Sequence, residues 1–380
     1  ALETRTPIVP VAVIGAEEQS LAMFDLKPVA RMLGMPAMPI TLTGLPFPNN
    51  QIPANRLDPI AMKYMALYPA PTSGGLANNY ASITQRTQNS STADVRIDHR
   101  FNGSNSMFAR YSYNDVDTFT PSACPPTADG IEPGCGGGLA FPGPNTTKAH
   151  GTQINYVRVH SASLESEVRA GYLKADIQSL PLNYGKNLSQ QFGLPGVNFD
   201  DVTSGLALMT VTGFAALGDS QFIPLIQIDN TWQVNGTLTK NLSTHSIKVG
   251  AGYIARQFTV FQSASPVGNF TFNSQLTDNG AGSGGNAVAS FLLGYPSQVA
   301  RSHSLIYPHY HTNEPNVFVQ DDWRATDWLT VNLGVRYDVF TPYTEEDNQI
   351  SNFDRQNAKV LVAGQGGVSS TAGVATDYSN

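Results

Sequence analysis

The sequence predicts an all-β fold whose strands run antiparallel, and three observations support this prediction. Hydrophobic and polar residues alternate along several segments, each of roughly ten residues. Charged residues make up only 13% of the 380 residues, about half of the roughly 25% that is usual in soluble domains. The connections between the alternating segments are either very short or very long.

The alternation is clearest in residues 329–339. A period of two puts successive side chains on opposite faces of a strand. One face would carry Leu329, Val331, Leu333, Val335, Tyr337 and Val339, and the other Thr330, Asn332, Gly334, Arg336 and Asp338. The same pattern is present in residues 94–101, 107–114, 164–172, 226–238 and 246–253. We therefore expect strands with one apolar and one hydrated face.

Two further features favour a membrane barrel over a soluble β protein with an apolar core. Tyr and Trp recur near the ends of the expected strands, as in the aromatic girdles of membrane barrels (Tyr111, Tyr113, Tyr172, Trp232, Tyr253, Trp323, Trp328 and Tyr337). Residues 102–106 and 324–327 form short connections, whereas 115–148 and 260–295 form long ones. Short turns at one rim and long extracellular loops at the other are typical of outer-membrane barrels. The soluble alternative stays open at this point.

The chain divides into three expected regions. Residues 1–90 are Pro-rich and include a short helix near 59–67, for which Asp58 is the expected N-cap and Pro59 the first residue. Residues 91–345 would form the barrel strands and long loops, about ten to twelve strands in all, and 346–380 an irregular tail rich in Gly, Ser and Thr. We expect residues 329–340 to pair with 317–323 and to leave their other side open or filled by a neighbouring chain. Closure of the barrel, oligomeric state and the role of residues 1–45 do not follow from the sequence.

Cys124 and Cys135 are the two cysteines of the chain. They lie close together in a stretch rich in Pro and Gly, and no His accompanies them, so a metal site is disfavoured. Two cysteines that close a short loop favour a disulfide and an oxidising compartment. A pair of free thiols is the alternative.

Charged residues on the hydrated faces are the candidate site residues, because they would face the lumen of a barrel. They are Asp94, Arg96, Asp98, Arg100, Glu165, Glu167, Arg169, Arg336 and Asp338. A polar ligand could bind such groups, but a ladder of cross-strand ion pairs is the simpler interpretation.

No catalytic, cofactor or metal site is expected. His303, His309 and His311 lie near one another, but Pro308 interrupts the segment and indicates a loop. The acidic residues between 321 and 347 lack the spacing of a calcium loop, and residues 280–285 share only their glycine content with a phosphate loop. No nucleophile motif is present, so the chain is not expected to be an enzyme. A net charge of -7 with 22 dispersed basic residues excludes nucleic acid as a partner.

Several stretches resemble TonB-dependent receptors of the large Oar-like group that is common in acidobacteria. The resemblance covers about residues 45–355. It rests on the ordered set Phe47-Pro48-Asn49-Asn50-Gln51-Ile52-Pro53, Asp94-Val95-Arg96-Ile97-Asp98-His99, Gly218-Asp219-Ser220, Gly268-Asn269-Phe270-Thr271-Phe272, Ala289-Ser290-Phe291-Leu292-Leu293-Gly294 and Val319-Gln320-Asp321-Asp322-Trp323-Arg324.

This resemblance implies a barrel of about 22 strands, an N-terminal plug, and uptake powered by a TonB-type partner in the inner membrane. The chain departs from that pattern because no plug precedes its strands and because it ends at Asn380. The resemblance therefore predicts a fragment of an outer-membrane transporter barrel that is not transport-competent alone, located in the bacterial outer membrane and in contact with its lipid. A self-standing, surface-exposed β-rich binding or structural protein is the alternative. The substrate is unknown.

Overall fold

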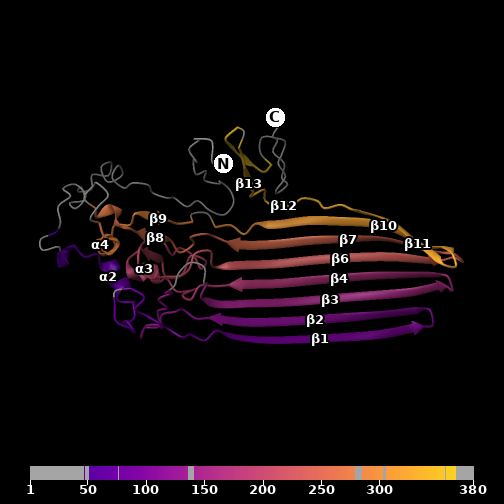
Figure 1. The fold of residues 1–380 in the computed structure, drawn as a ribbon, viewed down its shortest axis with the longest axis horizontal. Helices are drawn as coiled ribbons and strands as arrows, with labels where there is room; N and C mark the ends of the chain where they lie inside the picture. Colours follow the sequence, from indigo (N-terminus) through magenta and orange to yellow (C-terminus); the bar gives the residue numbers. More distant parts are fainter. Residues whose placement is uncertain are drawn as a thin grey trace.

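The computed structural model describes residues 47, 51–75, 77–135, 141–278, 285–302, 305–355 and 357–364. Its main element is an antiparallel sheet in which consecutive long strands lie side by side (Figure 1). These strands are β1 (Thr87–Asn102), β2 (Asn105–Thr120), β3 (Gly143–Ser161), β4 (Leu164–Ser179), β6 (Leu225–Asn241), β7 (His245–Gln262), β10 (His309–Thr326) and β11 (Leu329–Asp338). An open antiparallel sheet of this kind confirms the all-β prediction and is consistent with a partial barrel.

The described residues also contain shorter strands, namely β5 (Leu208–Val211), β8 (Asn269–Phe272), β9 (Gln298–Ala300), β12 (Thr344–Glu345), β13 (Ser351–Asp354) and β14 (Lys359–Val362). The expected number of about ten to twelve strands lies between the eight long strands and the fourteen strands of all lengths found in this part of the chain. The hairpin β13–β14 lies in a segment that we expected to be irregular. Residues 365–380 and 1–46 lie outside the described residues.

The connections differ at the two ends of the sheet. Turns at one end are short, and in the first of them the Asn102 side chain accepts hydrogen bonds from the Ser104 backbone N–H at 2.9 Å and the Asn105 amide at 2.8 Å. At the other end, long loops follow β2, β4 and β7. Together with the segment before β1, these loops form a compact unit at that end of the sheet, which we call the cap (Figure 1).

In its described residues, the cap contains three α-helices and a small sheet in the order β5–β8–β9. The helices are α2 (Pro59–Met65), α3 (Leu188–Phe192) and α4 (Ala287–Leu292), and short 3-10 turns lie at Ala54–Arg56 and Ser274–Leu276. Its core is apolar and draws on every one of these loops, with Tyr64, Cys124, Leu206, Leu217, Phe272 and Phe291 among its most buried members. Within the described residues, no helix is long and apolar enough to cross a membrane.

Helix α2 attaches the segment before β1 to the cap. Asp58 begins the helix, as expected, by accepting hydrogen bonds from the Ile60 and Ala61 backbone N–H groups, both at 2.8 Å. Tyr64 is fully buried, donates a hydrogen bond to the Ala207 carbonyl at 2.8 Å, and packs edge-on against Phe192. These contacts join residues more than 120 positions apart in sequence.

The disulfide prediction is confirmed. Cys124 and Cys135 are bonded, with their Cα atoms 5.3 Å apart, in the loop between β2 and β3. Both cysteines are buried in the cap core, at 4% and 5% exposure. The bond therefore closes a loop of the cap and also fills part of its interior.

Asp219 is the central polar group of the cap. Its side chain is buried and accepts hydrogen bonds from the Leu206 backbone N–H at 2.7 Å and from the Asn183 backbone and side-chain amides at 3.3 and 3.2 Å. A Cβ at Gly205 would lie 2.5 Å from the carboxylate, and Gly205 has a φ of +127°, so glycine is required there. Burial raises the pKa of Asp219 to about 6, although the hydrogen bonds from Leu206 and Asn183 lower it.

This raised pKa predicts that the cap loses stability as the pH rises. The contribution of Asp219 is fully present below its ordinary pKa of 3.8 and is lost as the pH rises through about 6, because the folded state then holds an unprotonated, buried carboxylate. Relative to Asp219→Asn, the wild-type cap should lose about 3 kcal/mol between pH 3 and pH 8. Hydrogen exchange of peptides from residues 183–225 in both proteins measures this difference. A difference that stays constant with pH would contradict the prediction.

Candidate functional site

The strand pairing sorts side chains onto two faces without interruption across the sheet. Rows of paired residues continue from strand to strand, and those near the row of Asp98 cross all eight long strands, so the period of two along one strand is kept in register with the next. One row on the polar face consists of Asp98, Phe108, Asn155, Arg169, Asn235, Gly252, Asn316 and Asp338. The row beside it on the opposite face is largely apolar, and includes Ile97, Ala109, Ile154, Ala170, Val234 and Tyr253.

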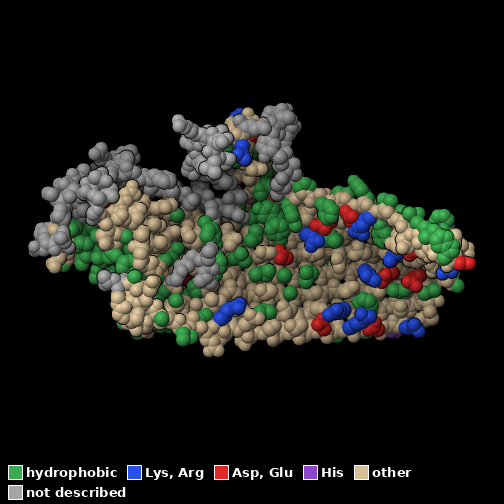
Figure 2. Space-filling view, viewed as in Figure 1, with side chains coloured by type: hydrophobic (Ala, Val, Ile, Leu, Met, Phe, Trp, Pro, Cys, Tyr) green, Lys and Arg blue, Asp and Glu red, His purple; other side chains and the backbone are tan. Residues whose placement is uncertain are grey.

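All the charged residues that the sequence singled out lie on this polar face. Arg169 and Asp338 share the row of Asp98, and Glu167 and Arg336 share the next row, that of Arg100. In Figure 2, which is turned toward this face, charged side chains gather over the half of the sheet that is farther from the cap. Side chains from β1, β4 and β11 are thus parts of one continuous surface.

The polar face is the more crowded of the two, as expected for the inner side of a curved sheet. Asn155 and Asn316 are buried on it, at 7% and 9% exposure, whereas Leu333 and Val335 on the apolar face are 56% and 71% exposed. Glycines show the same contrast. A Cβ at Gly250 on the polar face would lie 2.4 Å from the Phe318 ring, whereas a Cβ at Gly236 on the apolar face would meet nothing within 4 Å.

Ion pairs on the polar face are of two kinds. Arg96–Asp98 at 2.6 Å, Glu167–Arg169 at 2.7 Å and Arg336–Asp338 at 2.8 Å each join residues two apart on one strand. Arg110–Asp94 and Arg256–Glu314, both at 2.8 Å, cross between strands. The ladder is therefore only partly of the cross-strand type that we expected, because residues i and i+2 share a face within reach of an arginine side chain. Arg100 and Glu165 have no ion-pair partner among the described residues.

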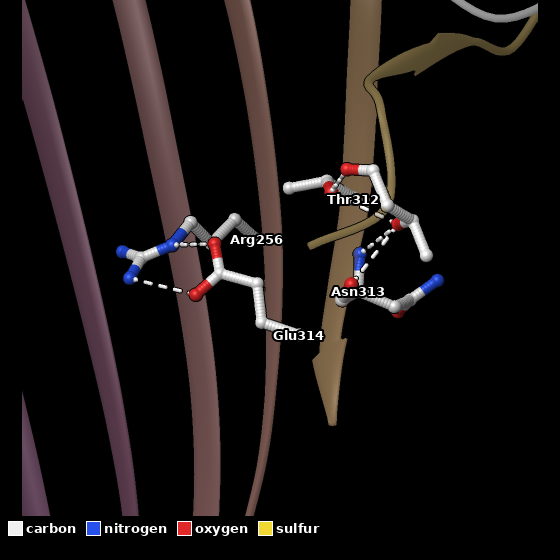
Figure 3. Close-up of polar contacts among 5 residues, drawn as sticks. Arg256, Thr312, Asn313 and Glu314 are labelled. Atoms are coloured by element: carbon white, nitrogen blue, oxygen red, sulfur yellow. Dashed lines mark hydrogen bonds and ion pairs between the residues drawn. The ribbon is translucent and has the colours of Figure 1, made fainter. Parts of the chain in front are cut away.

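Arg256 and Glu314 form the most enclosed of these pairs (Figure 3). The guanidinium of Arg256, on β7, donates to both carboxylate oxygens of Glu314, on β10, at 2.8 and 3.3 Å. Beside them, the backbone N–H of Asn313 donates to the Thr341 hydroxyl at 2.9 Å, and the Thr312 hydroxyl donates to the Thr341 carbonyl. Thr341 thus continues the β10–β11 contact beyond Pro315, which has no N–H to donate.

A hollow of about 450 Å³ lies on the polar face, toward the cap. Glycines 151 and 171 supply bare backbone at its centre, and Gln153, Gln233 and Arg256 are among its lining residues, with Arg110, Ser112, Leu173 and Thr231 around them. Both arginines are already paired with carboxylates. The hollow therefore offers amides and hydroxyls, with little net charge, to a neutral polar group.

The histidines that were considered as a metal site contact different residues and do not share a ligand position. His309 hydrogen-bonds the Thr259 hydroxyl at 2.6 Å, and His311 the Thr344 hydroxyl at 2.7 Å. His303 and residues 280–284 lie outside the described residues. Among the described residues, no group of three or more His, Cys, Asp or Glu side chains could hold a metal ion.

A family model described as "Outer membrane beta barrel domain" matches residues 24–380. The chain belongs to this family. As an outer membrane beta-barrel protein, it resides in the bacterial outer membrane and contacts the lipid there, in agreement with the sequence-based prediction. We expect the exposed, largely apolar face to meet the hydrocarbon.

Solved structures similar to this outer membrane barrel include several receptors. They include BauA, the ferric preacinetobactin receptor from Acinetobacter baumannii, with 12% identity, a TM-score of 0.40, and coverage of 75% of this chain and 37% of that one. The siderophore receptor PiuA from the same organism has 12% identity, a TM-score of 0.34, and coverage of 70% and 41%. The ferric-catecholate import receptor Fiu from Escherichia coli K12, in its closed form, has 13% identity, a TM-score of 0.33, and coverage of 78% and 39%. The barrel chain spans less than half the length of these receptors. No curated protein matches the sequence.

Sequence reasoning missed the Arg256–Glu314 pair and the hollow on the polar face. Both depend on register between strands that long loops separate, and no local motif encodes that register. One signal was available, because Gly151 and Gly171 interrupt otherwise alternating strands, and a glycine inside a strand often marks a close approach.

The assignment of faces predicts different costs for two neighbouring substitutions on β11. Leu333→Arg would place a charge in hydrocarbon and should cost about 2 to 4 kcal/mol, whereas Asn332→Lys on the polar face should cost far less. Equilibrium unfolding from phospholipid vesicles in urea measures both. If Asn332→Lys proves the more damaging, the faces are assigned the wrong way round.

The crowding contrast predicts opposite effects for two glycines on adjacent strands. Gly250→Val should destabilise the barrel by about 1 to 3 kcal/mol, because its side chain would overlap the Phe318 ring. Gly236→Val should be neutral or slightly stabilising, since it adds a β-branched side chain in open space. The same vesicle unfolding assay compares the two variants. Equal effects would show that the polar face is not the inner side of the curve.

Proposed function

We propose that this chain is part of an outer-membrane transporter barrel of the TonB-dependent receptor type, in which the polar face lines the lumen. The observation that carries the proposal is the crowded polar face, which continues without interruption across eight strands behind a lipid-facing apolar surface. A protein that only anchors a surface domain does not need a hydrated inner face with a hollow lined by glycines. The charged residues Asp94 to Arg100, Glu165 to Arg169, Arg336 and Asp338 are, on this proposal, lumen residues.

Their role in the lumen is structural on this proposal. The ion pairs hold most of these groups in fixed positions and cancel their charge, so that the wall is hydrated without attracting ions of one sign. Ligand selection is assigned to the cap, which lies at the long-loop end, and to the nearly neutral hollow below it. Energy for uptake would come from a TonB-type partner acting on the full-length protein, of which this chain supplies part of the barrel.

Labelling of single cysteines tests the lumen assignment. Thr231→Cys lies in the polar hollow and Val234→Cys on the apolar face of the same strand. A water-soluble maleimide should label residue 231 in lipid-reconstituted protein and spare residue 234, because hydrocarbon covers the latter. The native cysteines do not interfere, because they are bonded to each other.

A second pair of cysteines tests which rim is outside. Ser73→Cys in the cap should react in intact cells, and Asp327→Cys in a short turn only after the outer membrane is permeabilised. Labelling of residue 234 but not 231, or of residue 327 but not 73, would contradict the proposed arrangement. The competing function, a self-standing surface protein, is distinguished by reading the gene on both sides of this chain. A plug upstream and further strands downstream support the transporter.

A further inference from the structure

The hollow of about 450 Å³ on the polar face presents unpaired amides to its interior. It is lined by β2, β3, β4, β6 and β7, and Gln153 and Gln233 lie in one row across it with Gly171 between them. The side chains of both glutamines, and the Thr231 hydroxyl, form no hydrogen bond with any described residue. Since β3 and β6 are two strand spacings apart, or about 10 Å, the two amides can bond opposite edges of one ligand group.

The two glycines shape the floor of this hollow in different ways. A Cβ at Gly171 would lie only 3.3 Å from the amide nitrogen of Gln233, so glycine allows that amide to extend over the middle of the hollow. A Cβ at Gly151 would meet the Ser112 Cβ at 3.8 Å and the Leu173 side chain at 4.0 Å, which are ordinary contacts. A ligand group can therefore lie close to the sheet at residue 151 while it bonds the Gln233 amide.

The two arginines of the hollow offer hydrogen bonds without net charge. Arg110 and Arg256 each use Nε and Nη2 to bond a carboxylate, that of Asp94 in the first case and that of Glu314 in the second. The Nη1 group of each arginine bonds no described residue. A guanidinium carries five N–H donors, so these groups can still donate to an uncharged oxygen.

The charges around the hollow disfavour an anionic ligand. On the polar face of the eight long strands, Asp229 is the only charged residue between the hollow and the cap. It accepts hydrogen bonds from Gln227 at 3.0 and 2.9 Å and has no ion-pair partner among the described residues. The cations of this face that lack an ion pair lie nearer the short turns, and they are Arg100, Lys248 and Arg324. An anion entering from the cap would therefore meet a carboxylate and find no unpaired cation.

An aromatic cluster lies beside the hollow, in the next row toward the cap. Phe258 follows Arg256 on the same face of β7 and is the paired neighbour of Asp229 on β6. Its ring stacks on Tyr310 with centroids 4.8 Å apart and meets Tyr343 edge-on at 5.2 Å. All three rings are partly exposed. Flat apolar rings next to amides match a sugar ring, which has apolar C–H faces and hydroxyl groups at its edge.

We propose that the hollow binds a neutral oligosaccharide and that the ligand of this barrel belongs to that class. Hydroxyls of one sugar ring bond Gln153, Gln233 and Nη1 of Arg256, and a C–H face rests against Phe258. Asp229 accepts a hydrogen bond from a further hydroxyl. An amide both donates and accepts, as a hydroxyl does, so these groups match a polyol better than a ligand that only accepts. The inference rests on the proposed lumen and adds the substrate class to it.

Isothermal titration calorimetry tests the ligand class, with the chain in a detergent that has no sugar headgroup. The neutral probes are maltotetraose, cellotetraose and xylotetraose, which differ in linkage and in ring substituents. The comparisons are tetragalacturonate, a tetrasaccharide with negative charges, and the uncharged peptide N-acetyl-tetraglycine amide. We expect saturable binding of at least one neutral tetrasaccharide, and binding of both comparisons that is at least about tenfold weaker.

Two substitutions locate the binding in the hollow. Gln233→Leu keeps the size of the side chain and should weaken the sugar by about fivefold, which corresponds to about 1 kcal/mol. Gly151→Phe should fill the hollow and weaken it by about tenfold or more. The matched controls are Gln320→Leu and Gly334→Phe, which lie on the polar face but do not line the hollow. If a phenylalanine variant does not fold, the two leucine variants decide.

A third substitution tests the role of charge. Glu314→Gln removes the carboxylate that neutralises Arg256 and should strengthen tetragalacturonate binding by about fivefold, because the hollow then carries an unpaired cation. The proposal stands if this occurs and if the site variants, but not the controls, lose affinity for the neutral sugar.

The proposal is overturned if none of the three neutral tetrasaccharides binds, if either comparison binds as tightly, or if the controls lose as much as the site variants. Maleimide labelling of Thr231→Cys in lipid separates this result from the lumen assignment. Labelled protein that binds no neutral sugar contradicts the substrate class alone, whereas protein that is not labelled contradicts the lumen and the site together.

Discussion

The requirement that every backbone N–H and C=O be paired inside hydrocarbon governs the rest of this structure. An unpaired group costs several kcal/mol in lipid, so the strands must remain in uninterrupted register from one rim to the other. In this chain the register is continuous from β1 to β11, and irregularities fall at the short turns, as between Arg100 and Asn102 and between Arg324 and Thr326. The other features of the structure depend on this hydrogen-bonded register of the strands. The alternation of faces, the girdle and the position of the cap follow once the register is fixed.

The local elements could be predicted from the sequence because their physical causes are local. A period of two identifies the strand at Leu329–Asp338, Asp58 followed by Pro59 identifies helix α2, and two close cysteines identify the disulfide. The face of each charged residue follows from the same period. What could not be predicted is the alignment between strands. Arg256 meets Glu314 across 58 residues of sequence, and only the pairing of β7 with β10 brings them together.

The structure of the cap could not be predicted from the sequence either. Its loops look irregular in sequence, rich in Gly, Pro and Ser, and nothing in them indicates a shared core. They pack because the strands hold their ends side by side, which reduces the entropy that each loop loses on folding. Buried polar groups such as Asp219 then complete the packing, since it satisfies amides from two different parts of the loop between β4 and β6. The role of Gly205 beside Asp219 is recognisable only after the fold is known.

The attachment of helix α2 has a consequence for how such a protein can diversify. Tyr64 precedes the first strand, yet its hydroxyl meets the Ala207 carbonyl, and its ring meets Phe192 in the same distant loop. A change in any one loop therefore alters the surfaces on which the others rest, so the outer surface cannot be exchanged one loop at a time. New specificities would arise through coordinated replacement of the whole cap, or through substitutions confined to its exposed rim. Grafting experiments between relatives should accordingly move the segment before β1 together with the loops.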